Sequence, residues 1–207
     1  MKILLTAFDP FGGESCNASA EILARLEAPA PGVQLVKQIL PTQFVLGPQV
    51  LEEAIRLHRP DLLLMLGQAG GRPAVTFERV AINCMDARIP DNAGFQPREE
   101  AVVAGGPAAY FHTIPLADLV QHLRDRRLPA AISNTAGTFV CNALFYRARH
   151  YLESYLPGCR CDFVHIPYLE DQERPVDSPA LSADICAATL QRALEYLCGS
   201  ARLPEND

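Results

Sequence analysis

The sequence lacks features by which whole classes of protein are recognised. No apolar run approaches the roughly 20 residues that a membrane-spanning helix needs. The apolar stretch from Lys2 to Phe8 is cut off by Asp9 and Pro10, which is too early for a secretory signal peptide. We therefore expect no membrane association and a cytoplasmic location.

Basic residues are outnumbered and scattered. The chain has 18 Lys and Arg against 24 Asp and Glu, which gives a formal net charge of −6 at pH 7. The densest basic group, Arg124, Arg126 and Arg127, is interrupted by Asp125 and is typical of a solvated helix end. A protein that follows a phosphate backbone needs clustered Lys and Arg. The composition therefore argues against nucleic-acid binding.

Metal and cofactor motifs are also missing. Of the seven cysteines, only Cys159 and Cys161 are close in sequence, and no second Cys or His pair accompanies them as a zinc site requires. Neither Gly12-Gly13 nor the glycines of residues 67–71 fit a phosphate-binding loop or a dinucleotide-binding pattern. We expect no metal and no organic cofactor. An odd cysteine count suits a cytosolic chain that needs no disulfides.

The order of apolar segments predicts an α/β fold. A length of 207 residues favours one catalytic domain, residues 1–207, with a frayed tail at residues 199–207. Short apolar runs alternate with longer helical patterns, which predicts a three-layer α/β/α sandwich around a largely parallel, mixed and twisted sheet. Expected strands are residues 2–8, 33–40, 62–66, 75–82, 109–113, 130–133 and 161–166. Expected helices are residues 18–26, 48–58, 116–126, 140–155 and 178–197.

The turn after the strand at residues 130–133 is the first candidate for chemistry. Active groups in such sheets gather past the carboxyl ends of strands. Small residues and Gly137 lead here into a helix that has Cys141 in its first turn. A helix N-terminus favours a thiolate, so it lowers the pKa of a cysteine, and its free amides can bind an oxyanion. Cys141 is a candidate nucleophile, with a buried structural cysteine as the alternative.

Two further residues are suited to activate Cys141. His165 ends a buried strand and lies at the same sheet edge as Cys141 if the strands are parallel; there it can accept the thiol proton and later protonate an amine. Glu78 shares the face of its expected strand with Val80 and Ile82, and a carboxylate on an apolar face needs a partner such as a histidine. Taken singly, His165 is better explained as a core histidine bonded to a backbone carbonyl, and a surface glutamate beside Arg79 explains Glu78 as well as the catalytic role does.

Aromatic residues and one long connection complete the set of candidates. Phe8, Phe11 and Phe139 follow strands and together could line a small apolar pocket, although each could simply cover the sheet edge. The connection at residues 84–106 is rich in Pro, Gly, Asp and Asn. Connections of this length in compact domains are often functional.

These segments together resemble the type I pyroglutamyl peptidases, also called pyrrolidone-carboxylate peptidases. Five blocks carry the resemblance in the family's order: residues 5–13 (LTAFDPFGG), 67–72 (GQAGGR) with 77–83 (FERVAIN), 86–92 (DARIPDN), 133–142 (SNTAGTFVCN) and 165–169 (HIPYL). The resemblance implies a cysteine omega peptidase that removes N-terminal pyroglutamate from peptides through a thioester. It implies a triad of Cys141, His165 and Glu78, and a homotetramer.

The resemblance also implies a substrate pocket. The family's substrate-binding positions fall on Phe8, Phe11, Asn17, Thr42, Gln68, Arg88, Phe139 and Val140. Asn17 matches the residue that bonds the lactam, while Gln68 and Arg88 match positions in the oxyanion region or its support. Two departures, Ala7 for the usual Gly and Ala18 for the usual Pro, bear on the fine geometry of this pocket.

Three other functions are compatible with the residues alone. The same sheet edge could bind a nucleobase without hydrolysis, with Cys141 buried and inert. A nucleoside phosphorylase would need a phosphate site, for which the chain has no convincing basic cluster. Redox sensing would depend on a disulfide between Cys159 and Cys161.

Overall fold

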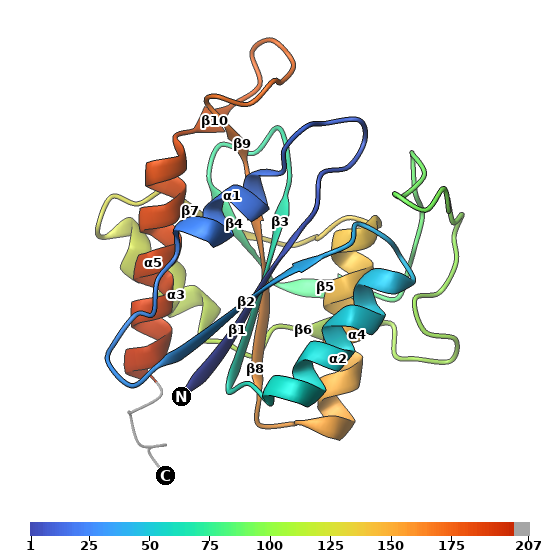
Figure 1. Ribbon diagram of the computed structural model, residues 1–207, viewed down its shortest axis with the longest axis horizontal. Coiled ribbons are helices and arrows are strands. Elements are labelled where there is room, and N and C mark those ends of the chain that lie inside the picture. Colours follow the sequence, from blue (N-terminus) through green and yellow to red (C-terminus); the bar gives the residue numbers. More distant parts are fainter. Residues whose placement is uncertain (201–207) are drawn as a thin grey trace.

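The computed structural model describes residues 1–200, and its centre is a six-stranded sheet in the order β2-β1-β3-β8-β4-β7 (Figure 1). The strands are β1 (Lys2–Phe8), β2 (Gln34–Leu40), β3 (Leu62–Gln68), β4 (Val75–Glu78), β7 (Ala130–Ser133) and β8 (Arg160–Ile166). Neighbouring strands are parallel except β4 and β8, so β4 and β7 run against the other four. The predicted mixed, largely parallel sheet is confirmed.

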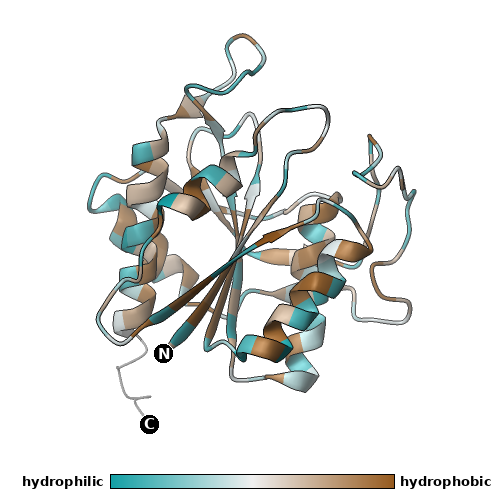
Figure 2. Cartoon of the chain, viewed as in Figure 1, coloured by the Kyte–Doolittle hydropathy of each residue, from teal (hydrophilic) through white to brown (hydrophobic). Residues whose placement is uncertain are grey.

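Helices cover both faces of the sheet. One face carries α1 (Ala18–Arg25), α3 (Leu116–Arg124) and α5 (Ala183–Ser200), and the other carries α2 (Leu46–His58) and α4 (Val140–Tyr155) (Figure 1). All seven residues of β3 are buried, as expected for a parallel strand covered on both faces. Figure 2 shows the apolar strands in the middle and polar residues on the outer helix surfaces. The predicted three-layer α/β/α sandwich is confirmed.

Most predicted elements occur with ends moved by only a few residues. The helix at residues 140–155 has the predicted bounds, and β3 runs two residues further than predicted, to Gln68. Asn17 caps α1, because its Oδ1 accepts the N–H of Ser19 at 3.0 Å. The apolar periodicity was therefore sufficient to locate the main helices and strands.

The predicted continuous strand at residues 75–82 is wrong. The chain breaks at Arg79, and β5 (Val80–Ile82) leaves the main sheet to pair antiparallel with β6 (Ala109–Phe111). The apolar pattern continues across the break because Phe77 is buried in one core cluster and Ala81 in the other. Glu78 consequently does not share a face with Val80 and Ile82.

The last helix begins five residues later than predicted. Ala180 and Leu181 form β10, which pairs with β9 (Tyr168–Leu169), and α5 starts only at Ala183. The Oγ of Ser182 accepts the N–H of Ile185 at 3.2 Å, which satisfies a first-turn donor. Residues 199 and 200 belong to α5 instead of the predicted frayed tail, and the remainder of that tail, 201–207, lies outside the described residues.

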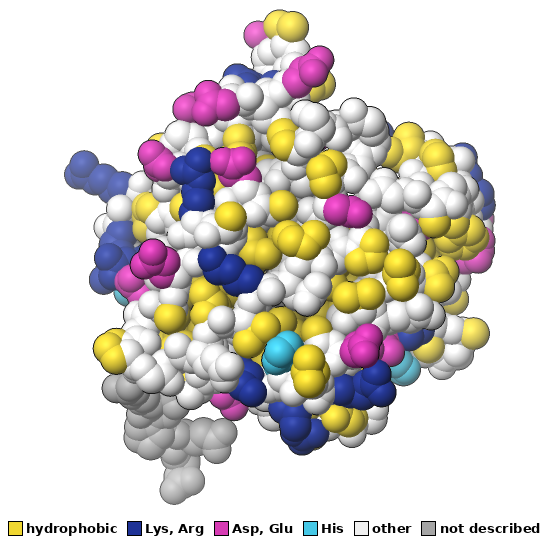
Figure 3. Space-filling view, in the orientation of Figure 1, with side chains coloured by type: hydrophobic (Ala, Val, Ile, Leu, Met, Phe, Trp, Pro, Cys, Tyr) yellow, Lys and Arg dark blue, Asp and Glu magenta, His cyan; other side chains and the backbone are white. Residues whose placement is uncertain are grey.

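The surface mixes charges of both signs. Figure 3 shows Lys and Arg side chains interspersed with Asp and Glu over the visible face. Some of them pair, for example Arg25 with Glu21 and with Asp184. Within residues 1–200, none of the helices has the length and hydropathy that crossing a bilayer requires.

Candidate active site

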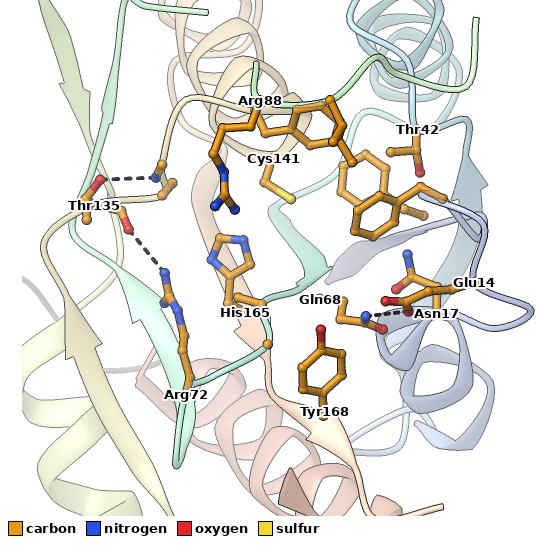
Figure 4. Close-up of a pocket in the computed structure, with 18 residues that line it drawn as sticks. Glu14, Asn17, Thr42, Gln68, Arg72, Arg88, Thr135, Cys141, His165 and Tyr168 are labelled. Atoms are coloured by element: carbon orange, nitrogen blue, oxygen red, sulfur yellow. Dashed lines mark hydrogen bonds between the residues drawn. The ribbon is translucent and has the colours of Figure 1, made fainter. Parts of the chain in front are cut away.

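A cavity of about 490 Å³ lies where β1, β3 and β8 end (Figure 4). It brings together most of the residues that the sequence singled out. Its lining consists of Phe8, Phe11, Glu14, Asn17, Thr42, Gln68, Ala69, Gly70, Arg72, Arg88, Ile89, Thr135, Ala136, Gly137, Phe139, Cys141, His165 and Tyr168. The volume is in the range of small-molecule sites.

The helix α4 holds Cys141 at the cavity. Cys141 is the second residue of this helix, and its neighbour Asn142 is fully buried. The amide of Asn142 donates to the carbonyl groups of Ile82 and Cys84 at 2.9 Å each and accepts the N–H of Ile82 at 2.9 Å. Three hydrogen bonds therefore fix the first turn of α4, and with it the thiol.

A glycine in β3 makes room for the thiol. A methyl group placed on Gly67 would lie 2.9 Å from Sγ of Cys141 and 2.8 Å from the ring of Phe163, which is too close for either. In the sheet register, Gly67 lies directly opposite His165 of β8. The sulfur therefore stands over the sheet beside His165, and Figure 4 shows both side chains facing the same space.

Glu78 and His165 form a buried pair. Nδ1 of His165 lies 2.7 Å from Oε1 of Glu78, and the two residues are 3% and 0% exposed. The pair fixes the ring with its other nitrogen, Nε2, available on the cavity side. Of the two readings of Glu78, the surface glutamate is wrong.

The reason for this proximity differs from the sequence argument. The sequence predicts Cys141 and His165 at one sheet edge only if the strands that precede them are parallel. Strand β7 is parallel to β4, and β4 is antiparallel to β8, so β7 and β8 run in opposite directions. Cys141 reaches His165 from the face of the sheet, carried by α4, and not from a shared strand edge.

The protonation states at the site follow from burial and charge. Burial raises the pKa of Cys141 to about 12, and the charge of Glu78 adds to the rise. Burial also lowers the pKa of His165, although its hydrogen bond to Glu78 opposes this. Burial alone would raise the pKa of Glu78, but the hydrogen bond and charge of His165, together with Arg72, hold it below its usual value.

These pKa directions correct one expectation. The helix N-terminus was expected to lower the pKa of Cys141, yet burial outweighs it and the pKa rises. At neutral pH the site therefore holds a neutral thiol beside a neutral imidazole and an ionised carboxylate. A nucleophile in this state needs a base within reach at the moment of attack.

The predicted aromatic pocket is present. Phe8, Phe11 and Phe139 all line the cavity, and the rings of Phe11 and Phe139 are 6.0 Å apart. Phe44, which the sequence reading did not single out, packs edge-on against Phe139 at 5.3 Å and supports it from behind. These residues form an apolar end of the cavity beside the thiol.

Asn17 and Thr42 are brought to the cavity by their contacts with Asp9. Nδ2 of Asn17 and Oγ1 of Thr42 both donate to the carbonyl of Asp9 at 3.0 Å. The backbone N–H of Thr42 also donates to a carboxylate oxygen of Asp9 at 2.7 Å. Asp9 thus joins the ends of β1 and β2 at the aromatic end of the cavity.

Gln68 is engaged with other protein groups. Its Oε1 accepts the backbone N–H of Ala18 at 2.8 Å, and its Nε2 donates to Glu14 at 2.8 Å. Gln172 donates to both Gln68 and Glu14, also at 2.8 Å. These contacts favour a supporting role for the Gln68 side chain, since they tie α1 to the end of β3.

Of the predicted pocket residues, Arg88 lines the cavity and Val140 does not. Arg88, from the long connection at residues 84–106, is exposed and turns its guanidinium into the cavity near His165 (Figure 4). Asp91 orders this connection, because its carboxylate accepts the N–H groups of Phe44, Ala93 and Phe95 at 2.9 Å.

Val140 is buried in the core on the α4 side and is not among the lining residues.

The sequence reading assigned no role to Arg72, Glu14 or Tyr168. All three line the cavity. The ring of Tyr168 lies over Gly70, where a methyl group would come within 2.2 Å of it. Arg72 and Tyr168 lie within the blocks GQAGGR and HIPYL, so a sequence signal was available, but nothing in the position of Arg72 indicates its contact with Glu78. Among residues 1–200, no three His, Cys, Asp or Glu side chains gather as a metal site would need.

Comparison with known proteins agrees with this geometry. A family model described as pyroglutamyl peptidase matches residues 1–199. The pyrrolidone-carboxylate peptidase of Bacillus velezensis is 47% identical over 207 residues, covering all of this chain and 94% of that protein. The corresponding protein of Thermococcus kodakarensis is 43% identical over 197 residues, with 95% and 96% covered.

Solved structures agree as well. The crystal structure of pyroglutamyl peptidase I from Bacillus amyloliquefaciens has a TM-score of 0.91 at 44% identity, covering 96% of this chain and 97% of the other. A mutant pyrrolidone carboxyl peptidase from Pyrococcus furiosus gives a TM-score of 0.90 at 34% identity, with 97% and 100% covered. The chain belongs to the pyroglutamyl peptidase family.

Proposed function

We propose that this chain hydrolyses the bond after an N-terminal pyroglutamate, with Cys141 as nucleophile, His165 as acid and base, and Glu78 as the group that orients His165. One observation carries the proposal. The cavity has an aromatic end that opens onto the thiol, and the thiol stands beside a histidine bonded to a buried carboxylate. Membership of a family of cysteine omega peptidases supports it.

The aromatic end suits the substrate ring. Pyroglutamate is a flat, five-membered lactam without a charged α-amino group. The faces of Phe8, Phe11 and Phe139 offer apolar surface to such a ring. Asn17, at the same end, would bond a polar group of the lactam. Proline lacks the lactam carbonyl, so binding proline would leave that partner unpaired, which is costly in a buried site.

Acylation begins from the neutral thiol. Nε2 of His165 takes the thiol proton while sulfur attacks the carbonyl carbon, and the carbonyl oxygen becomes an oxyanion. Glu78 stabilises the imidazolium that forms. The carbon–nitrogen bond then breaks, the imidazolium gives its proton to the departing amine, and a thioester of Cys141 remains.

Deacylation repeats the same steps with water. His165 takes a proton from water as the hydroxyl oxygen attacks the thioester carbon. The carbon–sulfur bond breaks, the proton passes to sulfur, and free pyroglutamate leaves. In both halves, we expect the backbone amides at the start of α4 and the guanidinium of Arg88, which faces the cavity, to stabilise the oxyanion.

A pair of fluorogenic conjugates tests the proposal. The pyroglutamyl conjugate of a fluorogenic amine should be cleaved with ordinary enzymatic turnover, and the prolyl conjugate at least about 10³-fold more slowly, because a buried polar partner is left unpaired. Absence of cleavage, with a shift in melting temperature on adding a nucleobase, would support a binding protein instead. Cleavage of both conjugates at equal rates would contradict the proposed lactam recognition.

We also propose one catalytic domain that assembles as a homotetramer in the cytosol. The family resemblance suggests the assembly. The cytosolic location is supported by free thiols, which persist in a reducing compartment. These are the thiols of Cys16, Cys84, Cys141, Cys159, Cys161 and Cys186. Light scattering coupled to size exclusion tests the assembly, since a single species of one-chain mass would refute it.

A further inference from the structure

Arg72 connects the buried carboxylate with the turn that carries the nucleophile. It lies between β3 and β4, and 23% of its side chain is exposed. Nη1 donates to Oε1 of Glu78 at 2.6 Å and also to the hydroxyl of Thr76. Nη2 donates to the carbonyl of Thr135 at 3.2 Å, in the turn before α4 (Figure 4). One guanidinium thus contacts both parts of the site.

Guanidinium and imidazole share a single carboxylate oxygen. Oε1 of Glu78 accepts from Arg72 at 2.6 Å and lies 2.7 Å from Nδ1 of His165. A fully buried carboxylate is costly to ionise unless a positive charge accompanies it. His165 is neutral through much of the catalytic cycle, whereas an arginine is always charged. Arg72 is therefore the permanent cation beside this carboxylate.

We propose that Arg72 is a positioning residue for the reaction, which keeps Glu78 ionised and holds it in register with the nucleophile turn so that His165 faces Cys141. The inference rests on the triad proposed above. Arg72 acts through Glu78, and it bonds the turn at Thr135 rather than the reacting atoms. Its loss should lower kcat much more than it raises KM.

Arg72 also bears on the pH dependence. Removing a positive charge favours proton uptake by the Glu78–His165 pair, whichever of the two takes the proton. The pKa of the pair therefore rises, and the acid limb of kcat/KM moves to higher pH. Other titratable or charged groups line the same cavity or lie close to the pair along the chain. They are Cys141, Arg88, Glu14 and Tyr168 at the cavity, Arg79 next along the chain, and Asp162 on β8. Because these groups are unchanged in both Arg72 variants, a shift of the acid limb in those variants reports Arg72.

The experiment compares three variants with the wild type over about pH 5 to 9, using the pyroglutamyl conjugate. Arg72→Met should lower kcat about 10²-fold, leave KM within about threefold, and raise the acid limb by about one pH unit. Arg72→Lys keeps the charge, so its limb should stay in place while kcat falls about tenfold, because lysine cannot reach both partners.

Arg79→Met is the matched control. Arg79 is exposed and donates to Oδ1 of Asn134 at 2.7 Å, so it contacts the same turn without touching Glu78. This variant removes the same charge one residue along the chain from Glu78. Its kcat should stay within about twofold of the wild type and its acid limb should not move.

Three results would overturn the inference. The first is an acid limb of kcat/KM that does not move in Arg72→Met. The second is a shift of this limb in Arg72→Lys as large as that in Arg72→Met. The third is a raised KM with kcat preserved in Arg72→Met. If circular dichroism shows that Arg72→Met does not fold, Arg72→Lys decides: a lowered kcat with the limb in place supports the inference, and a wild-type kcat refutes it. A wild type that does not cleave the conjugate would refute the proposed function instead, so the two failures are distinguishable.

Discussion

The two ends of the cavity are built in different ways. The aromatic end consists of Phe8 at the end of β1, Phe11 in the turn that follows it and Phe139 directly before α4, and two of its three rings are partly exposed. The catalytic end consists of Glu78 and His165, which are buried and bonded to each other, and of the half-buried Cys141. Changes at the aromatic end should weaken binding gradually, whereas a change to Glu78 or His165 leaves a buried group without its partner.

The largest effect is expected from the sulfur. Cys141→Ala should lower kcat/KM by about 10⁴-fold, because no other group in the cavity can form the thioester. Its melting temperature should stay within a few degrees of the wild type, since the side chain becomes only slightly smaller. Turnover of the pyroglutamyl conjugate measures the first quantity and calorimetry the second. Full activity in this variant would end the proposed mechanism.

Replacing His165 should lower kcat more than replacing Glu78. His165→Ala removes the proton carrier and should lower kcat about 10⁴-fold, while Glu78→Gln removes only its orientation and should cost about 10³-fold. Steady-state kinetics at a fixed pH gives both values. Equal losses would mean that the two residues do not have the separate roles assigned to them.

Gly67 tests the space on which the catalytic end depends. Gly67→Ala places a methyl group 2.9 Å from Sγ of Cys141 and 2.8 Å from the ring of Phe163, so the thiol must shift. A displacement of this kind should lower kcat about 10²-fold. Gly158→Ala is the control, because nothing lies within 4 Å of the added methyl group. An active Gly67→Ala variant would show that the sulfur need not stand where it does.

The aromatic end should give the smallest effect. Phe11→Ala removes one face of the ring pocket and the contact with Phe139, and it should raise KM about tenfold with kcat within about twofold. Phe111→Ala, at a side chain 61% exposed and outside the cavity, is the control. A fall in kcat equal to that of Glu78→Gln would remove the distinction between the two ends.

The main helices and strands could be predicted from the sequence because apolar periodicity directly reflects burial. The strand at residues 62–66 and the helix at residues 140–155 are uninterrupted signals, and both were placed well. The predicted elements are wrong where two elements share one apolar pattern. Residues 75–82 read as one strand although Arg79 divides them between two sheets, and Ser178 to Leu181 read as the start of a helix.

The site was predictable in its residues and less so in its causes. Cys141, His165 and Glu78 were identified from chain position and resemblance, but strand direction was not, so the reason for their proximity was wrong. The role of Arg72 is not predictable from the sequence, because a hydrogen bond from a turn to a strand residue six positions along the chain leaves no periodic signal. The pKa of Cys141 depends on packing around it, which no local motif encodes.

The raised pKa of Cys141 bears on how fast oxidants inactivate the enzyme. Peroxides oxidise thiolates far faster than thiols, so a cysteine that stays protonated at rest is a poor target for them. Burial, which obliges His165 to take the proton at each turnover, would also slow oxidative inactivation between turnovers. The resting enzyme would therefore tolerate oxidants better than a peptidase that stores its nucleophile as an ion pair.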